Sequence, residues 1–198
     1  MSEKKQILID QRVPIVVLEN AIIYLLRGEL RFKEEVIRDL SEHLEGKNRI
    51  EKSFKIIRKV LLSTDFAQQI QKEFTEQSFL QLQASERKAI LLLLLTEAYP
   101  FIFDLINSIT KTLRVQPIVN TNYINTSLAN LYGSNRTLYL GISSILTMLV
   151  ELGIYYRPKT GLYSKSEQLE LYNTNLIHLT RTITTKDDIL SEYISENI

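Results

Sequence analysis

The stretch that decides the fold is TNYINTSLANLYGSNRTLYLGISSILTMLVELGIYYRPKTGLYSKS, residues 121–166. Its first part predicts a short helix over 124–131, because the apolar residues there recur every three or four positions. Gly133 supplies the turn that follows, since glycine tolerates a positive φ. A longer helix comes next and ends near residue 152. Its core face is formed by Leu138, Ile142, Ile145, Leu149 and Leu152.

A β-hairpin is predicted directly after the longer helix. The residues Ile-Tyr-Tyr at 154–156 favour a strand, Pro-Lys-Thr-Gly at 158–161 favours a tight turn, and Leu-Tyr at 162–163 begins the returning strand. Helix, turn, longer helix and hairpin follow one another in the order of a winged helix-turn-helix. We predict this unit over residues 114–166, with the hairpin as its wing. The segment 114–122 is expected to be a linker or a short strand.

The rest of the chain predicts a mostly α protein of three parts. Residues 1–113 form an N-terminal helical domain, the winged helix-turn-helix follows at 114–166, and residues 167–198 form an acidic C-terminal segment. The predicted helices of the first domain cover residues 13–27, 31–44, 48–62, part or all of 64–80, and 85–113 with a break at Pro100. In the last part, 169–185 fits a strand or a weak helix, and 185–197 predicts a helix capped by Thr185.

Charge is distributed unevenly although the whole chain carries only +1. Residues 111–166 contain six basic side chains and one acidic side chain, Glu151, so this segment has a net charge of +5. Residues 1–110 are neutral overall, and residues 167–198 carry −4. An asymmetry of this kind points to an anionic partner.

Duplex DNA is the anionic partner that the predicted unit fits. In a helix-turn-helix the N-terminal residues of the second helix enter the major groove. Asn pairs with adenine edges and Arg with guanine edges, while basic residues on a wing contact phosphate or the minor groove. The predicted contacts are Ser134, Asn135, Arg136, Thr137 and Tyr139 on the helix and Arg157, Lys159 and Lys165 on the wing. Ser134 or Asn135 is also expected to cap the helix. A wing that only packs in the core or binds protein stays open as the alternative.

A second basic patch is predicted on the helix over 48–62. Its members are Arg49, Lys52, Lys55 and Lys59, with Arg58 beside them. An ordinary solvated helix face explains the pattern, and so does a surface for phosphates or for an acidic partner protein.

Several classes of protein are disfavoured by what the sequence lacks. It has no cysteine, which excludes disulfides, thiolate zinc sites and thiol catalysis. No glycine-rich phosphate loop, HExxH motif or nucleophile elbow occurs, and His43 and His178 have no evident partner. We therefore expect no enzyme activity, cofactor or metal. The unbroken apolar run of 89–95 is too short for a membrane span, so we expect a buried core helix pair and a cytoplasmic protein without a signal peptide.

Three stretches carry a resemblance to a known family. They are FKEEVIRDLSEHLEGKNRIEKSFKIIRKVLLS (32–63), ERKAILLLLLTEAYPFIFDLI (86–106) and INTSLANLYGSNRTLYLGISSILTMLVELGI (124–154). In helix and charge pattern the chain resembles the BrxA family, small accessory proteins of bacterial BREX phage-defence systems. The resemblance implies a mostly helical, non-enzymatic protein that binds DNA and joins other subunits of a defence complex. Applied to this sequence, the resemblance implies roles in DNA binding for Asn135, Arg136, Thr137, Arg157 and Lys159.

Two further functions remain open alternatives. A protein-interaction or scaffold subunit would use the winged unit and the second basic patch to dock acidic partners without nucleic acid. A stand-alone transcription regulator would be a homodimer on a palindromic site.

Overall fold

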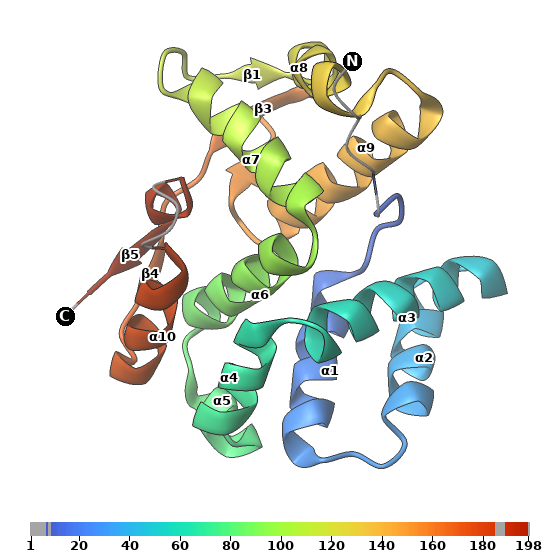
Figure 1. Ribbon diagram of the computed structural model, residues 1–198, viewed down its shortest axis with the longest axis vertical. Coiled ribbons are helices and arrows are strands. Elements are labelled where there is room, and N and C mark those ends of the chain that lie inside the picture. The colour runs from blue at the N-terminus through green and yellow to red at the C-terminus, as the bar shows by residue number, and fades with distance from the viewer. Residues whose placement is uncertain (1–6, 8, 185–188, 198) are drawn as a thin grey trace.

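The protein is mostly α-helical, with a few short strands (Figure 1). This computed structural model describes residues 7, 9–184 and 189–197. The helices are α1 (Ile15–Arg27), α2 (Phe32–His43), α3 (Lys47–Leu62), α4 (Asp65–Glu73), α5 (Glu76–Gln81), α6 (Ala84–Ala98), α7 (Pro100–Leu113), α8 (Thr121–Tyr132), α9 (Arg136–Glu151), α10 (Thr174–Thr184) and the 3-10 turn η1 (Leu190–Glu192). The strands are β1 (Val119–Asn120), β2 (Tyr155–Tyr156), β3 (Leu162–Lys165), β4 (Leu169–Leu171) and β5 (Ile194–Glu196).

Helix α6 lies at the centre of the molecule. All seven residues of the apolar run 89–95 are buried, so this helix is apolar on every side and is surrounded by other elements. It packs against α1, α3, α4, α7 and strand β4. Burial of the run confirms the predicted core helix.

A sharp bend separates α6 from α7. Pro100 occupies the first position of α7, where its missing N–H costs nothing, but it cannot continue the hydrogen bonds of α6. The chain direction changes by 112° from α6 to α7. In the part of the chain that the structure describes, no single helix is long and apolar enough to cross a membrane, and α6 and α7 reach that length only as this bent pair.

Elements α7 to β3 follow one another around a small antiparallel sheet of order β1-β3-β2. Val119 pairs with Tyr163 and Tyr155 pairs with Lys165, which confirms the predicted hairpin and the short strand before α8. Helix α8 starts at Thr121, earlier than predicted, because the Asn120 side chain accepts a hydrogen bond from the backbone N–H of Tyr123 at 2.8 Å. The α7 helix packs against α8 and β1.

The chain before α1 lies across α9. A Cβ atom on Gly141 of α9 would stand 2.9 Å from the carbonyl oxygen of Ile9, so only glycine allows this approach. The Ser144 hydroxyl donates to the carbonyl oxygen of Asp10 at 3.4 Å, and Arg12 forms an ion pair with Glu151. We call residues 9–13 the N-terminal strap.

The C-terminal part differs from its prediction. Residues 169–185 supply both β4 and α10, but the predicted helix over 185–197 is wrong for its described residues, which form η1 and β5. Strand β5 pairs in parallel with β4, and the Leu169 N–H donates to the Tyr193 carbonyl at 2.8 Å. This pairing satisfies backbone groups that a helix would have paired within itself. The predicted cap, Thr185, lies outside the described residues.

Glu86 joins this C-terminal part to α6. Its side chain is 2% exposed and accepts backbone N–H bonds from Gln83 at 2.8 Å, Tyr172 at 2.9 Å and Asn173 at 2.6 Å. The carboxylate therefore satisfies donors at the start of α6 and after β4 with one buried group.

Replacing Glu86 with Gln should destabilise the fold, because an amide NH2 takes the place of one accepting oxygen and leaves at least one of these part-buried backbone donors without an acceptor. We expect Glu86→Gln to lower the free energy of unfolding by about 1–3 kcal/mol in urea denaturation. The matched control Glu73→Gln, exposed on α4, should change it by less than about 0.5 kcal/mol. Equal stability of the two variants would contradict this role.

Candidate nucleic-acid interface

The turn between α8 and α9 presents four consecutive exposed residues. Gly133 makes the turn with a φ of 80°, and Asn135 caps α9 by accepting a hydrogen bond from the Leu138 N–H at 2.9 Å. The predicted cap is therefore confirmed for Asn135. Buried Leu138 anchors this end of α9 in the core, while residues 134–137 remain exposed.

The first turn of α9 favours a negatively charged group. Arg136 is exposed and has no ion pair within the described ranges. It lies where the unpaired N–H groups of a helix start add partial positive charge. Beyond it, Tyr139 is 43% exposed and shares a hydrogen bond of 2.6 Å with the Ser134 hydroxyl. The surface therefore combines one full positive charge with neutral hydrogen-bonding groups.

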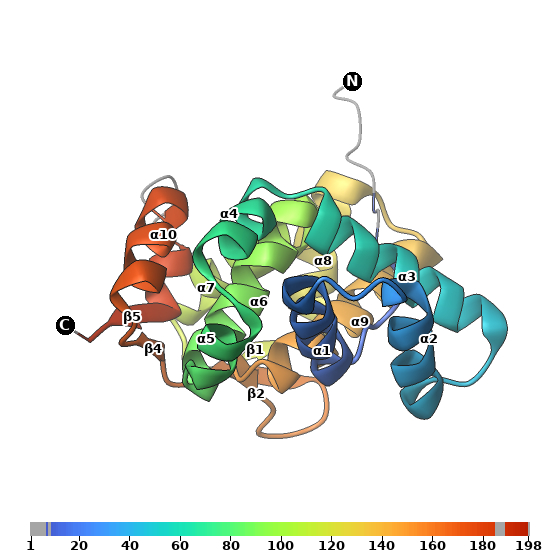
Figure 2. The ribbon, with the colours of Figure 1, turned by 90° about the horizontal axis from the view of Figure 1, so that it is seen from below.

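The hairpin carries two of its predicted basic residues near the turn, which projects from the molecule in Figure 2. Gly161 has a φ of 76°, and the Leu162 N–H donates to the Lys159 carbonyl at 3.0 Å. Lys159 is exposed in this turn. Arg157 donates to the Tyr163 hydroxyl at 2.7 Å, with its guanidinium 5.2 Å from the ring centre. Tyr163 therefore orients Arg157 without neutralising it.

Lys165, the third basic residue predicted on the wing, does not lie with Arg157 and Lys159 near the hairpin turn. Its Nζ lies 3.7 Å from a carboxylate oxygen of Glu192 and 5.1 Å from the ring centre of Tyr193. The same carboxylate accepts a hydrogen bond from Arg114 Nε at 2.8 Å. Glu192 thus partly neutralises Lys165 and Arg114, and no described residue of the C-terminal segment forms an ion pair with the hairpin turn.

Buried tyrosines fix the base of the hairpin. The Tyr155 hydroxyl lies 2.9 Å from that of Tyr193, which lies 2.6 Å from the Thr110 hydroxyl on α7. Burial is the main cause that raises the pKa of Tyr155 well above its usual value, so the phenol stays neutral and hydrogen-bonded. These contacts explain why Glu192 is held next to Lys165.

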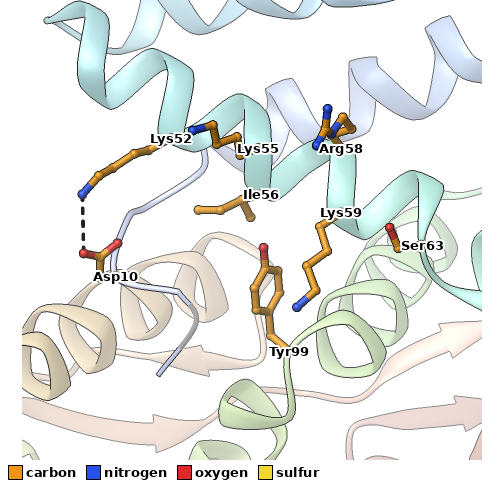
Figure 3. A pocket seen from close by; sticks show the side chains of 8 residues that line it. All are labelled: Asp10, Lys52, Lys55, Ile56, Arg58, Lys59, Ser63 and Tyr99. Carbon is orange, nitrogen blue, oxygen red and sulfur yellow. Dashed lines mark ion pairs between the residues drawn. The ribbon is translucent and has the colours of Figure 1, made fainter. Parts of the chain in front are cut away.

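The second predicted basic patch borders a pocket of about 440 Å³ (Figure 3). Three of its predicted members, Lys52, Lys55 and Lys59, line the pocket, whereas Arg49 is exposed outside it. The sequence did not identify two further lining residues, Asp10 and Tyr99. They come from the strap and from the α6–α7 junction, and no local pattern places them beside α3.

Comparison of the chain with protein-family models, with curated proteins and with solved structures finds no match. Among the residues that the structure describes, no group of three or more His, Cys, Asp and Glu side chains is placed to hold a metal ion. The two cationic surfaces are therefore the features from which a function can be inferred.

The cap on α9 is testable through stability. Asn135→Ala should lower the free energy of unfolding by about 1 kcal/mol, because the Leu138 N–H loses its acceptor. Asn135→Asp keeps an accepting oxygen and should retain wild-type stability. Urea denaturation of both variants measures the difference, and an equal loss in the two would show that the Asn135 oxygen is not used as a cap.

Proposed function

We propose that the protein binds duplex DNA through a winged helix-turn-helix formed by α7, β1, α8, α9, β2 and β3, which includes one helix before the predicted start of the unit at residue 114. One observation carries the proposal: the order helix, strand, helix, helix, strand, strand, with a sheet of order β1-β3-β2, is combined with an exposed, cationic start of α9. In this arrangement α9 is the recognition helix and the β2–β3 hairpin is the wing.

The chemistry of the exposed residues favours binding with weak sequence selectivity. Arg136 can contact a guanine edge or a phosphate, whereas the Asn135 oxygen is occupied by the cap and leaves only the amide NH2 for DNA. Arg157 and Lys159 on the wing contact phosphates, which position the protein without specifying sequence. Phosphate contacts then supply most of the affinity.

The resemblance to the BrxA family supports a wider proposal about the biological role. The protein acts as a non-enzymatic, cytoplasmic accessory component of a bacterial BREX-like defence system. Its partners are duplex DNA and other subunits of the defence complex. A scaffold that binds acidic subunits without DNA is the competing function, and the net charge of +5 on α3, a helix outside the winged unit, favours it.

A triple variant tests the DNA surface. Arg136→Ala, Arg157→Ala and Lys159→Ala together should weaken binding to a short duplex and make log K less dependent on log salt. The slope should fall by about 0.9 for each phosphate that the variant no longer neutralises. Fluorescence anisotropy at several salt concentrations measures both effects.

The control is a variant with the same charge loss on exposed cations elsewhere, Arg31→Ala, Lys33→Ala and Lys72→Ala. It should retain most of the affinity. If the Arg136, Arg157 and Lys159 variant has the same duplex affinity and salt slope as the control, DNA does not bind at the start of α9 and the hairpin.

A further inference from the structure

Helix α3 is a strongly cationic element that the proposed winged unit does not use. Its 16 residues include six basic side chains and one acidic side chain, a net charge of +5. The core takes the opposite face, where Phe54, Ile57 and Leu61 are buried. The cations are therefore directed away from the core and gather on one side of the helix.

Four of these cations line one side of an open groove. Lys52, Lys55, Arg58 and Lys59 line it from α3, and its remaining lining includes Tyr99 and the carboxylate of Asp10 (Figure 3). The described lining residues thus carry four positive charges and one negative charge. We call this space the α3 groove.

The residues that the structure describes neutralise the charge of the α3 groove only in part. Lys52 Nζ lies 3.7 Å from Asp10, but both side chains are at least 40% exposed, so water screens the pair. Lys59 Nζ lies 4.3 Å from the Tyr99 ring centre, a contact that orients the ammonium and leaves its charge. Lys55 and Arg58 have no ion pair to any residue that the structure describes. An anion in the groove would relieve the repulsion among the four cations.

The spacing of the cations fits a phosphodiester backbone. Lys52 and Lys59 are seven residues apart, or roughly 10 Å along the helix axis. Where α3 runs parallel to the duplex axis, this length spans about three phosphates of one B-DNA strand, at about 3.4 Å of duplex axis each. The phenol of Tyr99, whose pKa burial raises to about 12, stays protonated and directs its hydroxyl toward the groove as a further donor (Figure 3).

A free nucleotide fits the groove less well than a backbone does. A nucleotide site normally offers a surface on which the base can stack. Among the described residues that line the α3 groove, the one aromatic ring is that of Tyr99, which is 3% exposed, with Lys59 over it. The lining therefore provides for phosphates and leaves nothing for a base.

The α3 groove is also next to the proposed recognition helix. The strap forms one wall of the groove through Asp10, and the Asp10 carbonyl oxygen accepts the hydrogen bond from Ser144 of α9. A single extended segment thus separates α3 from α9, and Arg12 at its far end forms an ion pair with Glu151 at the end of α9. In Figure 1 this segment runs from α9 toward α1 beside α3.

We infer that the α3 groove is a second binding site for the phosphate backbone of the duplex that α9 contacts, and that the Asp10 carboxylate competes with those phosphates for Lys52. The inference rests on the proposed function, because it assigns a further surface to the same DNA partner. The groove contributes affinity and no sequence specificity.

Two variants test the inference in opposite directions. Lys52→Ala, Lys55→Ala and Arg58→Ala together remove three exposed cations and should lower duplex affinity. They should also reduce the salt slope by roughly 0.9 for each phosphate left without a cation. Asp10→Asn removes the competing charge and should raise duplex affinity about twofold to fivefold at low salt. Glu73→Gln, the same change of charge on α4, should leave affinity unchanged. The probe is a short duplex of random sequence, measured by anisotropy at several salt concentrations.

The outcomes separate this inference from the proposed function. Loss of affinity in the α3 variant together with a gain in Asp10→Asn supports the α3 groove as a backbone site. An unchanged salt slope in the α3 variant overturns the inference about the α3 groove. If the Arg136, Arg157 and Lys159 variant still binds more weakly, the winged surface is the DNA-binding surface by itself. That result leaves α3 as a surface for an acidic protein. If only the α3 variant loses affinity, the groove stands and the winged surface fails.

Discussion

Burial of α6 is the constraint on which the rest of the structure depends. A helix that is apolar on every side cannot face water, so other elements must cover it all round. Helices α1, α3 and α4 pack against it, as do α7 and strand β4. Glu86 holds the C-terminal segment against α6, because its buried carboxylate accepts backbone hydrogen bonds both at the start of α6 and after β4. The placement of parts far apart in sequence thus follows from enclosing one helix.

The same constraint determines where charge can lie. Because α3 gives its apolar face to the core, its cations are confined to one side, and the strap then forms a wall beside them. The hairpin turn is exposed for a different reason: its base is fixed by the buried hydroxyls of Tyr155 and Tyr193, so the turn extends beyond the core. A chain with a net charge of +1 therefore presents two local cationic surfaces.

These surfaces have different chemical capacities under the proposed function. The start of α9 combines Arg136 with hydroxyl and amide groups that can read base edges. The α3 groove offers ammonium and guanidinium groups for phosphates and little else. Among the described C-terminal acids, Glu192 acts locally, because it lies between Lys165 and Arg114 and forms no ion pair with Lys159 at the turn. Under the proposed function, most of the affinity for the duplex therefore comes from its phosphate backbone.

Sequence alone determined the local elements of this protein, because helical periodicity, Pro100, Gly133 and the Asn135 cap act within a few residues of one another. It also predicted the hairpin and the stripe of lysines on α3. It did not predict β5, since the pairing of 194–196 with β4 depends on a strand more than twenty residues away. Nor could it place Asp10 beside Lys52 or Glu192 beside Lys165. Those contacts arise only when the elements close around α6, and the tertiary structure therefore decided which cations remain available to a partner.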